Sequence, residues 1–201
     1  CPPSTLIGPM SSKLKNTNIE VGAQNCHERE SYGAFTGSIN SKMLKNIGAR
    51  YVIIGHSENR KAGETNKLIN LKIKSALKIG LNVIFCIGET LHERKKKITK
   101  RVLNKQIKLG LNKVKKNKHI LIAYEPVWSI GSGIIPKSNE LIDIINFIKR
   151  RNKNLKVLYG GSVNSKNISE LKSINNIDGF LVGGASQVSK KFIDIIKKTY
   201  N

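Results

Sequence analysis

Residues 157–184, VLYGGSVNSKNISELKSINNIDGFLVGG, are the part of the sequence most informative about its fold. It holds two short apolar runs, each ending in a glycine pair, Gly160-Gly161 and Gly183-Gly184. A single pair is typical of an ordinary turn. Because glycine lacks a Cβ, backbone N–H groups there can approach an anion closely, and a following helix N-terminus attracts phosphate. Two such loops after consecutive strands are typical of the phosphate site of a (β/α)8 barrel.

Similar apolar runs recur along the whole chain and predict six strands. The predicted strands are Ile19–Ala23, Tyr51–Ile54, Asn82–Cys86, Ile120–Ala123, Val157–Tyr159 and Gly179–Val182. Stretches with apolar residues at helical spacing separate most of them. The clearest of these are Asn66–Ile79, Thr99–Lys116 and Asn139–Arg151. Alternating strands and helices predict a parallel sheet covered by helices.

Polar residues follow directly after several of these strands, which is where a (β/α)8 barrel keeps its active site. They include His56, Glu89 and Glu125. No GxGxxG motif follows the first strand, which disfavours an open dinucleotide-binding sheet. We therefore expect a single α/β barrel domain over residues 1–201, although six strands are two fewer than the barrel needs.

The charge of the chain is extreme for its length, with 36 Lys and Arg against 13 Asp and Glu, a net +23 over 201 residues. Lysine and arginine can bind phosphate backbones. However, the lysines are dispersed, and aromatic residues make up only 5% of the chain, so base-stacking platforms are scarce. An excess of Lys, Ile and Asn is also what an A- and T-rich coding bias produces. The composition disfavours nucleic acid as the partner.

The three cysteines form no CxxC pair, which argues against a disulfide framework or a structural zinc site. We therefore expect a reducing, cytoplasmic location. No apolar run approaches the ~20 residues of a membrane helix, so no membrane association is expected. His27, His92 and His119 have no ligand spacing around them. We predict no metal site.

Two residues after strands are candidates for proton transfer. Glu125 follows an apolar strand, where burial can raise a carboxyl pKa toward that of a general base. His56 precedes a helical turn whose N-terminal partial charge favours a neutral imidazole. Taken alone, either residue is more often structural. The segment from Pro126 to about Ile135, with Trp128 and two glycines, is typical of a lid that closes over a ligand.

Seven segments stand out along the sequence: Gly22–Asn25 (GAQN), Gly33–Gly37 (GAFTG), Tyr51–Glu58 (YVIIGHSE), Cys86–Thr90 (CIGET), Ala123–Gly133 (AYEPVWSIGSG), Tyr159–Val163 (YGGSV) and Asp178–Ser186 (DGFLVGGAS). In these segments, and in the order in which they follow one another, the chain resembles the triosephosphate isomerase family from end to end. The resemblance implies a TIM barrel. It also implies cofactor-independent interconversion of dihydroxyacetone phosphate and D-glyceraldehyde 3-phosphate, in glycolysis and gluconeogenesis.

The resemblance also implies roles for individual residues. Glu125 would be the catalytic base, and His56 the neutral electrophile that polarises the carbonyl. Glu58 would support the site from behind. The backbone of four residues would bind the phosphate: Gly131, Ser162, Gly183 and Gly184. Thr36 would lie on the loop that enters the partner subunit of a homodimer.

The sequence departs from the family pattern at three places. In the family, a first βα unit and a second strand precede the position of Cys1, and the catalytic lysine lies in that first unit. By this alignment, the sequence lacks the first unit and most of the second strand. We therefore expect that the chain alone folds poorly or is inactive. Ser38 and Asn59 replace a charged pair at the dimer loop. Ile134 replaces the usual lysine of the lid.

Two other functions stay open at this point. One is a different phosphate-binding barrel enzyme, such as those of tryptophan or histidine biosynthesis, although the segments around His56 and Glu125 argue against it. The other is a basic nucleic-acid-binding or scaffold protein that has lost catalysis.

Overall fold

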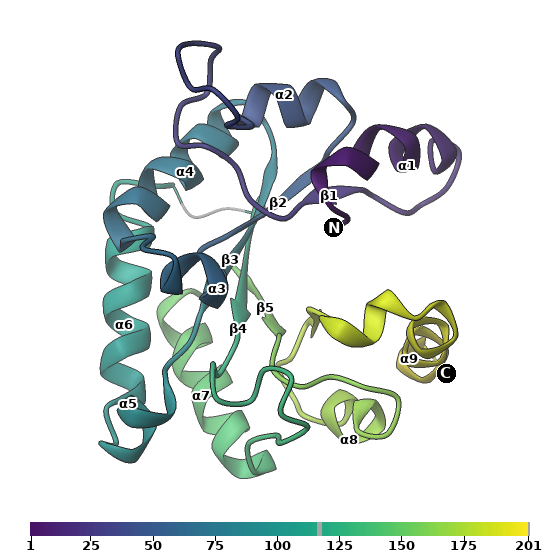
Figure 1. Ribbon diagram of the computed structural model, residues 1–201. Helices are drawn as coiled ribbons and strands as arrows, with labels where there is room; N and C mark the ends of the chain where they lie inside the picture. Colours follow the sequence, from purple (N-terminus) through teal and green to yellow (C-terminus); the bar gives the residue numbers. More distant parts are fainter. Residues whose placement is uncertain (116–117, 201) are drawn as a thin grey trace. The chain divides into compact units, whose positions relative to one another are not determined.

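The computed structural model describes residues 1–115 and 118–200 (Figure 1). The chain divides into two compact units. Unit 1 comprises Cys1–Cys86 and Gln106–Leu121, and unit 2 comprises Ile87–Lys105 and Ile122–Asn201. The division passes through two strands and one helix, so each unit holds a piece of each. In both units, each strand lies beside the strand that follows it in the chain.

The strands of unit 1 pair in parallel. They are β1 (Gly22–Ala23), β2 (Tyr51–Ile54) and the greater part of β3 (Asn82–Ile87). Gly22 lies opposite Tyr51, and Val52 lies opposite Val83. The side chains of Val52, Ile54, Val83 and Phe85 are fully buried. Burial on both faces is what a parallel sheet under helices requires, and it explains why these strands read as continuous apolar runs.

The helices of unit 1 are short apart from one. They are η1 (Ser4–Leu6), α1 (Ile7–Lys13), α2 (Ser41–Asn46), α3 (Ser57–Lys61) and α4 (Asn66–Lys78). The Thr65 side chain caps α4 by accepting a hydrogen bond from the Leu68 N–H. Ile69, Ile73 and Ala76 recur at helical spacing and are fully buried, and α4 packs against β2 and α2.

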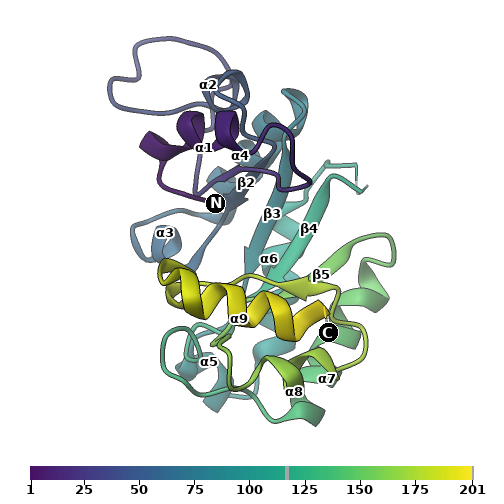
Figure 2. The ribbon, with the colours of Figure 1, turned by 90° about the vertical axis from the view of Figure 1, so that its right-hand side faces the viewer.

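Unit 2 continues the same alternation. Its strands are most of β4 (Ile120–Tyr124), β5 (Lys156–Tyr159) and β6 (Gly179–Phe180), and β5 pairs with β6 in parallel. Its helices are α5 (Leu91–Lys95), the first part of α6 (Thr99–Gly110), α7 (Ser138–Arg151), α8 (Ile168–Lys172), η2 (Gly184–Gln187) and α9 (Ser189–Tyr200). Figure 2 shows α9 running beside α8, in agreement with the contacts between them.

Helix α7 covers β5 with an apolar face and ends in charges that suit its dipole. Leu141, Ile145 and Ile148 are fully buried on that face. Glu140 lies in the first turn, and Lys149 is one of three basic residues in the last turn. Negative charge near the N-terminus and positive charge near the C-terminus both stabilise a helix.

The predicted strands are confirmed in place and in direction, but the outermost two are shorter than predicted. The predicted strand Ile19–Ala23 contains β1, which is only two residues long, and Ile19 is 62% exposed. The predicted strand Gly179–Val182 likewise contains only the two residues of β6. In the described part of the chain, each of these strands has one neighbour. A strand paired on one side has fewer ladder hydrogen bonds to extend it.

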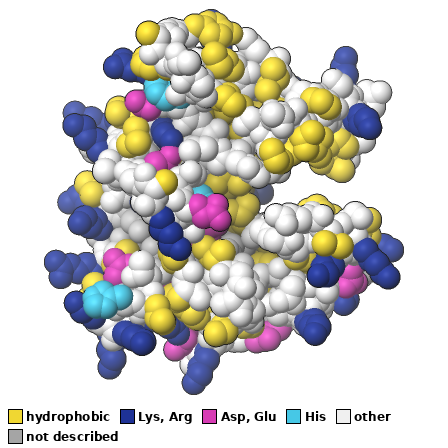
Figure 3. All heavy atoms as spheres, viewed as in Figure 1, with side chains coloured by type: hydrophobic (Ala, Val, Ile, Leu, Met, Phe, Trp, Pro, Cys, Tyr) yellow, Lys and Arg dark blue, Asp and Glu magenta, His cyan; other side chains and the backbone are white. Residues whose placement is uncertain are grey.

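The predicted helix Thr99–Lys116 ends at Gly110, and its last predicted residue lies outside the described part of the chain. None of the helices within residues 1–115 and 118–200 combines the length and the apolar character of a membrane-spanning segment. Figure 3 shows Lys and Arg side chains spread over the visible face rather than gathered in one patch.

Candidate active site

His56 lies in unit 1, two residues after the end of β2, and it caps α3 through its own ring. The ring atom Nδ1 accepts a hydrogen bond from the Glu58 N–H at 3.4 Å. An accepting Nδ1 carries no proton, so the proton of the neutral ring lies on Nε2. Burial lowers the pKa of His56. Both the hydrogen bond to Nδ1 and the lowered pKa favour a neutral imidazole with its proton on Nε2.

Glu58 stands beside His56 but in solvent. Its carboxylate Oε2 lies 3.7 Å from His56 Nδ1, and its side chain is 84% exposed. The negative charge of Glu58 raises the His56 pKa, against the larger effect of burial. At this exposure solvent screens most of that attraction. Glu58 thus acts on the histidine only weakly.

Arg60 holds the end of β2 against the end of β3, a role that the sequence did not reveal. Its guanidinium donates to the Gly55 carbonyl at 2.7 Å and to the Cys86 carbonyl at 3.0 Å. Gly55 has a φ of +78°, a backbone conformation that favours glycine. Arg60 thereby fixes the turn that carries His56. The available signal was an arginine one helical turn after a strand-end histidine.

Glu125 lies in unit 2, directly after β4, and its residue is only 3% exposed. Its backbone N–H donates to the Ile87 carbonyl at 2.8 Å. Two glycines make room for it. A Cβ at Gly88 would lie 1.8 Å from the Glu125 carbonyl oxygen, and a Cβ at Gly160 would lie 2.8 Å from Glu125 Cγ. Both glycines are therefore required by the close approach of Glu125.

Glu89 is a second buried carboxylate in unit 2, at the end of β3, with no exposed surface. It accepts hydrogen bonds from Trp128 Nε1 at 2.9 Å and from the Tyr124 hydroxyl. Burial is the main effect on Glu89 and raises its pKa, although these hydrogen bonds oppose the shift. The sequence placed Glu89 at a strand end and assigned it no function. The structure shows that it holds the first part of the lid.

The same tryptophan is covered on its face by Arg94. The guanidinium carbon of Arg94 lies 4.2 Å from the Trp128 ring centroid, a cation–π contact. Arg94 in turn pairs with Glu140 of α7 at 2.6 Å. Trp128 is therefore fixed at its edge by Glu89 and on its face by Arg94. The following residues of the lid extend from this fixed point.

We define the lid as residues 126–136. Its middle is exposed and turns sharply at Gly131 and Gly133, whose φ angles are +68° and +76°. The turn is closed by Ser132, whose hydroxyl donates to the Ser129 carbonyl at 3.0 Å and accepts from the Ile134 N–H at 3.1 Å. Gly131 thus lies on an exposed, tightly turned segment.

The two glycine-pair loops also lie in unit 2. Ser162 is half-buried, and its carbonyl accepts from the Asn167 side chain at 2.9 Å. Its N–H donates to Ser129 Oγ at 3.2 Å, so the lid contacts this loop directly. Gly183 and Gly184 are exposed at the start of η2. A Cβ at either would meet nothing within 4 Å, so open space borders this backbone.

Unit 2 therefore brings Glu125, the lid and the loop 159–162 together, whereas His56 and Glu58 lie together in unit 1. Among the residues described, no three His, Cys, Asp or Glu side chains come together as a metal ion would require.

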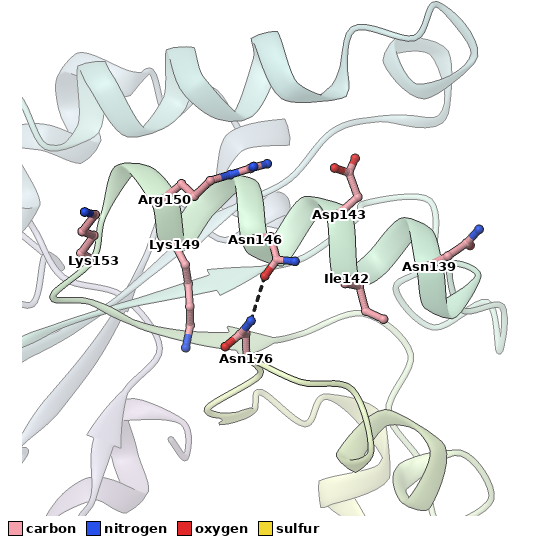
Figure 4. A pocket seen from close by; sticks show the side chains of 8 residues that line it. All are labelled: Asn139, Ile142, Asp143, Asn146, Lys149, Arg150, Lys153 and Asn176. Carbon is pink, nitrogen blue, oxygen red and sulfur yellow. Dashed lines mark hydrogen bonds between the residues drawn. The ribbon is translucent and has the colours of Figure 1, made fainter.

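A surface groove of about 710 Å3 lies along α7 and contains none of the predicted site residues (Figure 4). Asn146 of α7 and Asn176 bridge it with a 2.9 Å hydrogen bond.

The sequence of the chain is similar to those of known enzymes. The model of the family described as triosephosphate isomerase matches residues 1–199. The triosephosphate isomerases of Carboxydothermus hydrogenoformans and Dictyoglomus thermophilum are each 45% identical to this chain over 98% of it, covering 83% and 84% of those proteins.

The crystal structure of triosephosphate isomerase from Bartonella henselae superimposes with a TM-score of 0.92 at 36% identity, over 100% of this chain and 86% of that one. The fold is thus the α/β barrel type of these enzymes. The chain belongs to the triosephosphate isomerase family.

Proposed function

We propose that Glu125 and His56 carry out the reaction of this family, the glycolytic interconversion of dihydroxyacetone phosphate and D-glyceraldehyde 3-phosphate. The chain is an isomerase of the family. The observation that carries the assignment of roles is the burial of Glu125, whose backbone and side chain fit against two glycines that no larger residue could replace.

Glu125 removes a proton from one substrate carbon and returns it to the neighbouring carbon. Burial favours this, because a carboxylate stripped of water is a stronger base. His56 donates from Nε2 to the substrate oxygen that gains negative charge. Its neutral state suits this role, since Nδ1 is already occupied by the Glu58 N–H. The reaction moves protons only, and we propose that it needs no cofactor or metal ion.

The phosphate of the substrate binds backbone N–H groups in unit 2. The donors in this proposal are Gly131 of the lid, Ser162 after β5, and Gly183 and Gly184 before η2. Open space beside the last two supports it. Glu58 acts through His56, by the charge of its side chain and by its backbone N–H.

The experiment is the isomerase activity of Glu125→Gln and His56→Gln in a chain extended before Cys1 by the first βα unit of a family member, with the exposed residues Glu20 and His92 changed to glutamine as controls. Loss of a positioned acid or base lowers kcat by about 10²- to 10⁴-fold. We expect this loss in the two site variants and full activity in the controls. Unchanged activity in Glu125→Gln overturns the assignment.

We further propose that the chain is a single domain, that it works in the cytoplasm, and that it forms a homodimer through the loop that carries Thr36. Thr36 and its neighbours Gly33–Gly37 are exposed. The ring of Phe35 contacts the ring of His27, with centroids 4.7 Å apart and an angle of 37° between the rings. Sedimentation of a Thr36→Arg variant tests the dimer: the variant is expected to sediment as a monomer, and an unchanged dimer contradicts the proposal.

A further inference from the structure

The hydroxyl of Ser129 has three hydrogen-bond partners. Its Oγ lies 2.6 Å from the Ile134 carbonyl oxygen, 3.2 Å from the Tyr159 hydroxyl and 3.2 Å from the Ser162 nitrogen. Ser129 itself is completely buried. A hydroxyl offers one proton and two lone pairs. Ser129 therefore donates to Ile134 and accepts from Tyr159 and Ser162, and all of its hydrogen-bonding capacity is used.

These partners lie on two different segments. Ile134 belongs to the far half of the lid, whereas Tyr159 is the last residue of β5 and Ser162 lies in the loop that follows it. Ser129 consequently joins the two halves of the lid to each other and joins the lid to this loop. Ser132 makes a different kind of contact, because its hydroxyl bonds only within the lid in the described hydrogen bonds.

The glycine at position 161 is a second, independent sign of this contact. A Cβ there would lie 2.3 Å from the Tyr159 hydroxyl oxygen and 2.7 Å from Ser129 Oγ. Both distances are too short for any side chain. Gly161 is thus the residue that allows the two hydroxyl groups to meet beneath the loop.

The Ser162 N–H has two competing acceptors. In the structure it donates to Ser129 Oγ, and in the proposed function it donates to the substrate phosphate. One N–H makes one strong hydrogen bond at a time. Loss of this donor also weakens the bond from Ser129 to Ile134, because linked hydrogen bonds polarise one another.

Resting on the phosphate-binding role proposed for Ser162, we propose that Ser129 is a positioning residue whose hydroxyl competes with phosphate for the Ser162 N–H. Phosphate that takes this N–H releases the lid from the loop after β5, so phosphate binding and release of the lid are coupled. Removing the Ser129 hydroxyl frees the N–H, and a typical hydrogen bond corresponds to about a five-fold change in an equilibrium constant. Phosphate should therefore bind about five-fold more tightly to Ser129→Ala.

The test is a titration of the full chain with inorganic phosphate. The Ser162 amide resonance reports on the N–H directly. Trp128 is the single tryptophan of the chain and adjoins Ser129, so its fluorescence reports on the lid. Ser173→Ala is the control, since it removes an exposed hydroxyl that donates to the Glu170 carbonyl, outside the lid and the phosphate loops. We expect tighter phosphate binding in Ser129→Ala and unchanged binding in Ser173→Ala.

The possible results separate the two proposals. If phosphate does not shift the Ser162 amide resonance of the wild type, both the phosphate-binding role of Ser162 and the competition between Ser129 and phosphate are overturned. A wild-type response with equal or weaker binding in Ser129→Ala overturns the competition alone. A variant with a damaged fold would bind phosphate more weakly, so tighter phosphate binding cannot be explained by damage to the fold. Ser129→Cys, whose thiol is a poor acceptor, should shift in the same direction and decides the question if the alanine variant does not fold.

Discussion

The Trp128 indole donates a 2.9 Å hydrogen bond to the carboxylate of Glu89, and so ties the lid to the end of β3. Tyr124 donates to the same carboxylate from β4. Glu89 is completely buried, and the hydrogen bonds from Trp128 and Tyr124 favour its ionised form. Its burial makes the ionised form expensive.

Glu89→Gln should make the protein less sensitive to pH. Burial raises the Glu89 pKa in the folded state. A raised carboxyl pKa contributes stability that is fully present below the unfolded value, near 4.5, and is lost as pH rises through the folded value. Glutamine can accept from Trp128 without titrating. As pH rises from 4 to 8, the wild type should therefore lose unfolding free energy relative to Glu89→Gln.

Urea unfolding across that range measures the difference. Glu20→Gln, which changes an exposed carboxyl, is the control and should give a flatter difference. A difference between Glu89→Gln and wild type that is independent of pH contradicts the interpretation.

Gly88→Ala should disrupt both stability and catalysis. The new Cβ would lie 1.8 Å from the Glu125 carbonyl oxygen, a backbone atom that no change of rotamer can move. Overpacking of this kind costs about 1–3 kcal/mol or more, and a displaced Glu125 cannot keep its alignment with the substrate. We expect a lower urea midpoint and a kcat reduced by about 100-fold, since small misplacements have such effects.

Gly8→Ala is the matched control for this substitution. Gly8 lies in α1, and a Cβ there meets nothing within 4 Å. Alanine in a helix is better than glycine by about 0.5–1 kcal/mol, so this variant should be slightly stabilised and fully active. Equal behaviour of the two variants would refute the steric argument.

Lys72→Met should be strongly destabilising, because Lys72 and Glu64 form a buried ion pair. Their side chains are 8% and 10% exposed, and Asn25 bonds to both. Removing one partner of a buried pair leaves a charge unpaired, at a cost of about 3–5 kcal/mol. The double variant Lys72→Met with Glu64→Gln should recover most of this loss, as measured by urea unfolding.

Lys78→Met provides the comparison, since Lys78 pairs with Glu30 at the surface and is 71% exposed. Exposed pairs contribute about 0–1 kcal/mol. A Lys72→Met variant no less stable than Lys78→Met would show that the buried pair is unimportant.

The positions of the strands, and of the residues that follow them, could be predicted from the sequence. A strand buried on both faces consists of apolar residues, and polar residues begin near its end. The sequence could not predict Ser129, Glu89 or Arg60 as supports of the site, since their partners lie about 30 residues away in the chain or are backbone atoms. Lys72 did leave a signal. It falls on the apolar face of α4, three residues after Ile69 and four before Ala76. Among 29 lysines, that position was easily overlooked.

The net charge of +23 should speed the capture of a phosphorylated substrate. A positive field raises association rates by about 10- to 1000-fold, and salt screens it over about 10 Å at 0.1 M. We expect kcat/KM to fall by about ten-fold as salt rises from low to physiological concentration, while kcat changes little. Glyceraldehyde without its phosphate is the control substrate, and its kcat/KM should not depend on salt. Equal salt dependence for both substrates would exclude steering.

The His56 imidazole should titrate below its usual value of 6.5. Burial lowers its pKa, and Glu58 raises it by a smaller amount. Protonation of Nδ1 would also break the bond from the Glu58 N–H that caps α3. A lowered histidine pKa gives stability that is fully present above pH 6.5 and is lost as pH falls through the folded value.

Glu58→Gln should lower the His56 pKa further, because it removes a neighbouring negative charge whose effect opposes that of burial. The shift is expected to be small, since the Glu58 side chain is 84% exposed and well screened. NMR titration of the His56 ring in the wild type and in Glu58→Gln measures the His56 pKa in each protein. A His56 pKa that rises in Glu58→Gln would mean that Glu58 acts through the helix cap rather than through its charge.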